Sequence, residues 1–214
     1  MRLLPEKSTL VVVGAFNPAI LNPSWIAKNA LGIIDDRQVQ VEMLTPVSIG
    51  LSAPPARYSF EGISYSVTSQ RLTVHFEGLD EAGAIKSVRM VRRIFELLHH
   101  TPVTGVGFNF GFASERPSAK LTQLMASEVS LLEGLADDAA IVMQGWGNTV
   151  RLGEELLGIQ CTYDAASVSI DVNAHRNLSD ATGLVAVVAD DGVFATHLAQ
   201  AIAIAVQLNE GELE

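Results

Sequence analysis

The residues of this sequence best suited to chemistry are Asp171, Asn173 and His175, which recur at intervals of two. Such alternation predicts a β-strand with one outward face and one buried face. The positions on the buried face are all apolar: Ala166, Val168, Ile170, Val172 and Ala174. A carboxylate, an amide and an imidazole on one face can bind a polar ligand, with Arg151 or Arg176 completing the site. The same row is also typical of the solvated side of an antiparallel sheet, and we expect it to carry no metal.

No other segment has the spacing of a catalytic or metal-binding motif. The histidines show none of the spacings typical of zinc sites. Cys161 is the only cysteine, and we expect it to be a small buried hydrophobe rather than a nucleophile. Glu154 and Glu155 are adjacent, so their side chains point in different directions and do not form an acid–base pair. We therefore predict no cofactor and no metal.

A buried-looking run of valines leads into the segment Gly14-Ala15-Phe16-Asn17-Pro18 near the N-terminus. This stretch resembles the entry of nucleotidyltransferases that join a nucleotide to a small phosphorylated acceptor. In that family, histidines follow the proline and stabilise the phosphates in the transition state. Here the corresponding positions are Ile20, Asn22 and Pro23, so the part that would supply positive charge is missing.

The composition favours an apolar, acidic protein. Of the 214 residues, 48% are hydrophobic and only 18% are charged, and the formal net charge is −10. Such a chain repels nucleic acid unless its basic residues are concentrated in one place. The densest cluster is Lys86, Arg89, Arg92 and Arg93, on a predicted helix, so nucleic acid is an improbable partner. We expect no membrane span, and with a single cysteine we expect a cytoplasmic location.

The pattern of elements predicts an α+β fold with an antiparallel or mixed sheet built from hairpins and a C-terminal meander, packed by three or four helices. Residues 63–68 and 72–76 alternate around a turn at Ser69 and Gln70, and Asp80 opens an amphipathic helix. The strand at 103–112 is expected to bury Val106, Phe108, Phe110 and Phe112. Its opposite face carries Gly105, Gly107, Asn109 and Gly111, and the glycines should let another backbone or a helix approach closely.

The final helix is expected over residues 192–208, capped by Asp190 or Asp191. One stripe, formed by Phe194, Leu198, Ile202 and Ala205, should pack on the sheet. No charged residue lies between Asp191 and Glu210, which suits a surface covered by another subunit. The residues expected at that interface are Thr196, Gln200, Ile204 and Gln207.

We expect a single domain over residues 1–214, with two similar sub-domains at about 1–113 and 114–214 as an alternative. The leading functional hypothesis is a non-enzymatic subunit or interaction protein of a larger intracellular assembly, with itself or another protein as partner. The alternative is an enzyme or small-ligand-binding protein whose dispersed polar site surrounds Asp171, Asn173 and His175. A third hypothesis is recognition of a peptide strand at an edge of the sheet, although the sequence does not choose an edge.

Overall fold

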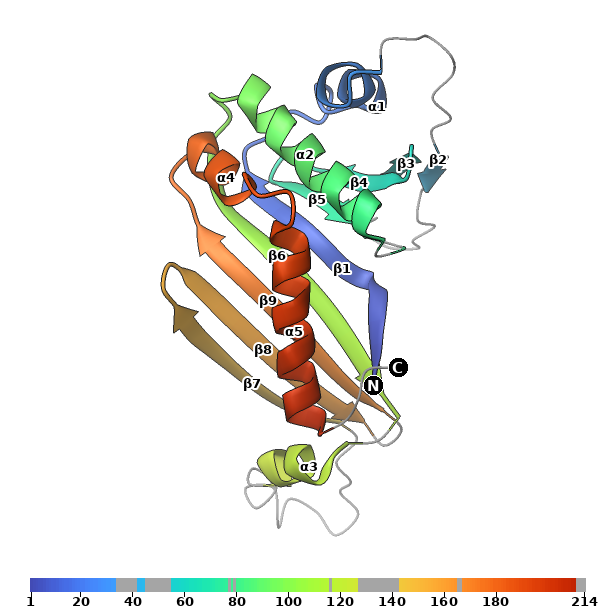
Figure 1. Ribbon diagram of the computed structural model, residues 1–214, viewed down its shortest axis with the longest axis vertical. Coiled ribbons are helices and arrows are strands. Elements are labelled where there is room, and N and C mark those ends of the chain that lie inside the picture. The colour runs from blue at the N-terminus through green and yellow to red at the C-terminus, as the bar shows by residue number, and fades with distance from the viewer. Residues whose placement is uncertain are drawn as a thin grey trace.

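The structure, a computed structural model, describes residues 1–33, 42–44, 55–76, 78, 80–115, 117–126, 143–164 and 167–210. These residues form an α+β fold around one antiparallel sheet of nine strands in the order β2-β3-β4-β5-β1-β6-β9-β8-β7 (Figure 1). The strands are β1 (Arg2–Gly14), β2 (Glu42–Leu44), β3 (Arg57–Phe60), β4 (Ile63–Val67), β5 (Arg71–His75), β6 (Val103–Ser114), β7 (Met143–Leu152), β8 (Glu155–Asp164) and β9 (Val168–Asn177). The helices are α1 (Pro23–Trp25), the π-helix η1 (Ile26–Ala30), α2 (Glu81–Leu97), α3 (Ala119–Ala126), α4 (Ala181–Val187) and α5 (Val193–Asn209).

The two halves of the sheet repeat one strand order on either side of the central β1–β6 pair. Moving outward from β1, the strands are β5, β4, β3 and the short β2; moving outward from β6, they are β9, β8 and β7. In the first half the long strand β1 is followed by four strands, β2 to β5, and then by α2. In the second half the long strand β6 is followed by three strands, β7 to β9, and then by α4 and α5. A single hydrogen-bonded sheet runs through both halves, and the division into sub-domains remains a prediction.

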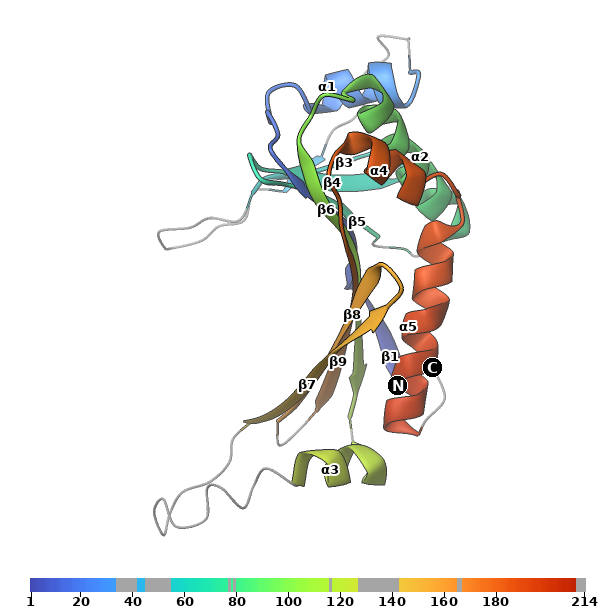
Figure 2. The same cartoon turned by 90° about the vertical axis from the view of Figure 1, so that its left-hand side faces the viewer.

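Helices α2, α4 and α5 lie on one side of the sheet (Figure 2). Helix α2 begins where expected, because the Asp80 carboxylate accepts a hydrogen bond from the Gly83 amide at 2.6 Å. The cap expected for α5 is wrong: Gly192 holds that position, and Asp190 instead accepts from the Gly192 amide at 2.9 Å. The Asp191 carboxylate does not cap α5 but forms ion pairs with Arg89 and Arg92 on α2.

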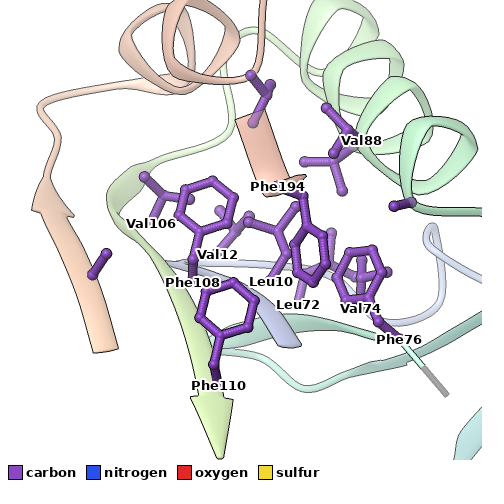
Figure 3. Close-up of a cluster of buried hydrophobic side chains, with 14 of the residues drawn as sticks. Leu10, Val12, Leu72, Val74, Phe76, Val88, Val106, Phe108, Phe110 and Phe194 are labelled. Carbon is purple, nitrogen blue, oxygen red and sulfur yellow. The ribbon is translucent and has the colours of Figure 1, made fainter. Parts of the chain in front are cut away.

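The core lies between the helices and the sheet, with Phe194 of α5 at its centre (Figure 3). Its ring stacks on Phe76 with centroids 3.7 Å apart and lies 5.2 Å from Phe110. The buried face expected for β6 is confirmed, since Val106, Phe108, Phe110 and Phe112 are all at most 2% exposed.

The stripe by which α5 packs on the sheet differs from the expected one. The buried residues are Phe194, His197, Ala201, Ala205 and Asn209, whereas Leu198 and Ile202 are half-buried. His197 takes the inner position because its ring stacks on Phe108, with centroids 4.1 Å apart and planes 11° apart. Its ring nitrogen Nδ1 also lies 2.8 Å from the Val193 carbonyl, so the polar ring is satisfied in the core.

Strand β7 is unbroken, although it contains two glycines, Gly145 and Gly147. The chain reverses after the strand, at Gly153 and Glu154. Gly153 has φ +62°, and a two-residue hairpin loop with glycine first is the type II′ turn that fits twisted strands.

Among the described residues, no helix is long and apolar enough to cross a membrane.

Candidate ligand-binding face

The side of the sheet opposite the helices carries polar and small residues. Figure 2 shows both ends of the sheet bending away from α2, α4 and α5, so this open face is concave. The strand registers align one row straight across all nine strands, which we call the polar row. It consists of Glu42, Ser59, Ser64, His75, Thr9, Asn109, Asn173, Gly158 and Thr149, from β2 to β7. On the central strands the alternate residues, such as Leu10 and Phe108, are buried under the helices.

A hollow of about 680 Å³ lies on the open face over strands β1, β6, β9, β8 and β7. This volume is within the range of about 300–1,000 Å³ typical of small-molecule sites. Its lining is mostly polar or glycine: Lys7, Asn109, Phe110, Gly147, Asn148, Thr149, Gly158, Ile159, Gln160, Asp171, Val172 and Asn173. The hollow therefore offers many hydrogen-bonding groups beside the apolar surface of Phe110, Ile159 and Val172.

An irregularity in β1 brings Lys7 into the hollow. The register between β1 and β6 shifts between Leu4, which faces Gly111, and Thr9, which faces Asn109. The shift includes Pro5, which has no amide hydrogen to donate to a neighbouring strand. The Lys7 ammonium thereby reaches β9, where it lies 3.0 Å from a carboxylate oxygen of Asp171 and 3.2 Å from the Ser169 hydroxyl.

Two asparagines connect the middle of the polar row. The side-chain amide of Asn173 donates to the side-chain oxygen of Asn109, whose own amide donates to the Thr9 hydroxyl at 2.9 Å. Neither asparagine uses all its capacity in these bonds, because each amide has two donor hydrogens and a carbonyl with two lone pairs. The pair is thus held in place while still able to bond to a ligand.

The predicted site residues separate in the structure. Asp171 and Asn173 both line the hollow, but His175 does not. The His175 ring lies over Gly105, and its Nε2 is 3.0 Å from the side-chain oxygen of Asn177. Arg151 and Arg176 also lie outside the lining, and Arg176 forms an ion pair with Glu154.

Sequence reasoning missed Lys7, Asn109 and Gln160 as members of this site. Asn109 had a signal, because it interrupts an otherwise glycine-rich face of β6. Gln160 faces Asp171 across the β8–β9 register, which is known only once the strands are paired. Nothing in the sequence indicated Lys7, because it reaches Asp171 only through the register shift between β1 and β6.

A serine–histidine pair lies elsewhere on the open face. The Ser66 hydroxyl is 3.2 Å from Nε2 of His75, and Nε of Arg57 donates to Ser64 at 2.7 Å. Burial, and then the charge of Arg57, lower the pKa of His75 to about 4. Such an imidazole is a weak general base at neutral pH, and among the described residues no carboxylate bonds to it. The pair is therefore a poor candidate for nucleophilic catalysis.

Two further possibilities are a nucleophilic thiol at Cys161 and a metal site. Cys161 is fully buried, as expected, and burial raises the pKa of its thiol to about 11. Within the part of the chain that the structure describes, no three histidine, cysteine, aspartate or glutamate residues are grouped to hold a metal ion.

The N-terminal segment that resembles nucleotidyltransferases lines a second, mainly apolar hollow of about 380 Å³. The hollow lies between the Phe16–Leu21 loop and the end of α2, and His99 and His100 contribute to its lining. The sheet around this segment is antiparallel, with β1 between β5 and β6. Asn22 caps α1, because its side-chain oxygen accepts a hydrogen bond from the Trp25 amide at 3.0 Å.

Only two of the four residues expected at an α5 interface are exposed in the structure. Thr196 and Gln207 are exposed, whereas Gln200 and Ile204 are half-buried, and Ile204 packs against the core.

The basic cluster on α2 is neutralised by ion pairs. Lys86 pairs with Glu61 and Arg93 with Glu96, while Arg89 and Arg92 share Asp191. These carboxylates reduce the net positive charge that the helix presents to a partner.

The sequence matches no family model and no curated protein. The function of the open face must therefore be inferred from its own geometry.

Proposed function

We propose that the protein is a non-enzymatic binding protein that holds a small, uncharged, polar molecule in the hollow on the open face. The observation that carries this proposal is the hollow of about 680 Å³ lined by amide, hydroxyl and glycine residues. Solvated faces of antiparallel sheets are usually polar, but they need not be concave. Concavity together with convergent polar groups is what distinguishes a binding site from a merely wet surface.

The charges in the hollow favour a neutral ligand. Among the described residues that line it, Lys7 and Asp171 are the only charged ones, and they form an ion pair. An anion or a cation would have to compete with that pair for one of its members. The amides of Asn109, Asn173 and Gln160 instead offer donors and acceptors together, which suits a molecule carrying hydroxyl or carboxamide groups.

The proposal can be tested by following the side-chain amide resonances of ¹⁵N-labelled protein. The probes are a set of monosaccharides, polyols and simple primary amides, each added to millimolar concentration. A bound probe should shift the amide signals of Asn109, Asn173 and Gln160 in a saturable way. Asn173→Leu should abolish the shift, while Asn177→Leu, on the same strand but outside the hollow, should preserve it. Binding that is unchanged in Asn173→Leu, or no saturable shift with any probe, would count against the proposal.

A second candidate function is a subunit of a larger assembly, favoured by the outer side of α5. This helix exposes Ala195, Thr196, Ala199, Ala203 and Gln207 and has no charged residue between Val193 and Asn209. Exposed sides of surface helices normally carry charges, so an uncharged side suits contact with another protein. A cytoplasmic location remains part of this proposal, since the only cysteine is a buried free thiol.

A further inference from the structure

Strand β7 is an edge of the sheet with unusually apolar exposed side chains. It comes last in the strand order, so no described strand pairs with its outer side. Of the five exposed large hydrophobic side chains in the described residues, three are on this strand: Met143, Val150 and Leu152, at 66%, 44% and 46% exposure. Exposed apolar residues on a free strand edge are typical of a site that pairs with another chain.

The usual protection of an edge strand is missing from β7. Its ten residues contain no proline and only one charge, Arg151. Its register with β8 runs without a bulge from Met143 opposite Asp164 to Leu152 opposite Glu155. The opposite edge of the sheet differs, because β2 is only three residues long, and a short edge is itself protective.

The hairpin turn determines which backbone groups of β7 face outward. In a two-residue hairpin the residues flanking the turn, here Leu152 and Glu155, form a hydrogen-bonded pair. Alternation from that pair directs the amide and carbonyl groups of Gly145, Gly147, Thr149 and Arg151 away from β8. These groups form a regular row of donors and acceptors along the edge of the sheet.

We propose that β7 pairs antiparallel with β7 of a second copy of this chain, with the two-fold axis at Asn148. This register joins outward-facing backbone groups on both strands and places Trp146 beside Val150 of the other copy. Asn148 then faces its own counterpart, and Arg151 faces Gly145. This inference rests on the second candidate function, a subunit of a larger assembly, which we call the assembly candidate. It identifies the partner as a second copy of the chain and the contact surface as β7.

Charge permits a second copy as the occupant in this register, and the register pairs the apolar Trp146 and Val150 twice. The chain carries a net charge of −10, so two copies repel wherever their acidic residues meet. Strand β7 has no acidic residue, and the register centred on Asn148 sets its single arginine opposite a glycine. The strand therefore lets two copies meet without placing like charges opposite each other, and an isologous contact of this kind closes as a dimer.

The experiment combines mass measurement with a cross-link at the axis. Light scattering should give twice the chain mass of 22.9 kDa. Residues facing each other at a non-hydrogen-bonded antiparallel position have Cα atoms about 4.5 Å apart, which a disulfide can span. Mild oxidation of Asn148→Cys should therefore produce a covalent dimer. Asn177→Cys, exposed at the end of β9, is the matched control and should stay monomeric on a non-reducing gel.

Thr149→Pro tests the backbone hydrogen bonds directly. The Thr149 amide points away from β8 in this arrangement, so proline removes a bond between copies and leaves the β7–β8 ladder intact. Thr149→Pro should be monomeric while unfolding cooperatively with little change in stability per chain. A monomeric wild-type protein would overturn this inference, whereas the assembly candidate, which also allows a different protein as partner, would be tested separately by co-purification. A wild-type dimer that neither cross-links at residue 148 nor dissociates in Thr149→Pro would overturn this inference alone. A heterologous β-strand bound to β7 of a monomeric chain would instead favour peptide recognition at this edge.

Discussion

The Lys7 ammonium lies 3.0 Å from the Asp171 carboxylate, and the lysine stem reaches it by crossing directly over Gly111. A Cβ placed on Gly111 would lie only 2.3 Å from Cδ of Lys7 and 2.7 Å from its Cβ. At Gly105 the space is similarly occupied by His175, 2.9 Å from such a Cβ. At these two positions, side chains from neighbouring strands lie nearest to the space that we expected the glycines to leave free. At Gly105 a backbone also approaches closely, since the Arg176 carbonyl oxygen is 3.3 Å from the added Cβ.

Gly111→Ala should therefore destabilise the fold by displacing Lys7. Inserting a methyl group into an occupied space typically costs about 1–3 kcal/mol of unfolding free energy. Lys7→Ala removes the shortest contact, so the double variant should lose less than the sum of the two single variants. Urea unfolding of all three variants measures this coupling.

Gly145→Ala is the matched control for Gly111→Ala. It is also a strand glycine, but the nearest atom to its added Cβ is the Cys161 carbonyl oxygen at 3.7 Å, an ordinary contact distance. Its effect should stay within about 0.5 kcal/mol, as for most surface substitutions. Equal losses at the two glycines would show that the contact with Lys7 has no energetic consequence.

Phe108→Ala should lower the unfolding free energy by about 3–5 kcal/mol, the usual cost of emptying a buried aromatic site. Phe108 is 2% exposed, and His197 stacks on its ring, so the variant also leaves a core imidazole without its neighbour. Leu97→Ala, at a position 38% exposed, provides the comparison and should cost much less. Similar thermal shifts for the two variants would contradict the assignment of this β6 face to the core.

The stability of the protein should fall as the pH is lowered below about 6.5, partly because of His75. Its pKa in the folded protein is about 4, below the value of 6.5 in an unfolded chain. Between those values the unfolded state binds more protons than the native state, so each decrease in pH favours unfolding. The stabilisation contributed by His75 is thus complete above pH 6.5 and lost as the pH falls to about 4.

His75→Gln tests this pH dependence, because it removes the titrating group and should flatten the stability curve between pH 6.5 and 4. His100→Gln, at an exposed position, should change the slope much less. Chemical denaturation at several pH values measures the difference. An unchanged slope in His75→Gln would exclude His75 as a source of the acid sensitivity.

Ala203→Glu should reduce the molecular mass in solution if the outer side of α5 forms an interface. Ile204 is less suitable for this test, because it packs against the core and a charge there would also disturb folding. Ala203 is exposed, so the substitution adds charge without emptying or overfilling the core. Light scattering at several concentrations gives the readout. A mass that does not change would leave the β7 edge as the surface to examine.

Local pattern in the sequence determined the elements and their faces. Alternation identified β9 and its outward row, and the phenylalanines of β6 identified a buried face, because side chains point to opposite sides of a strand at every second residue. Helical spacing, together with the capping carboxylate of Asp80, placed the start of α2. In each case the deciding interactions join residues close together in the chain, so a single sequence contains them.

Only the tertiary structure decided which residues meet across the sheet. Lys7 reaches Asp171, a separation of 164 positions, through a register shift in β1 that alternation does not encode. His197 replaced Leu198 in the buried stripe of α5 because Phe108 offers its ring a stacking surface, and helical periodicity alone does not reveal that contact. The hollow exists because the paired strands bend together. Strand β7 forms an edge because it ends the order of the described strands. These features depend on strand order, register and curvature, which contacts between distant segments determine.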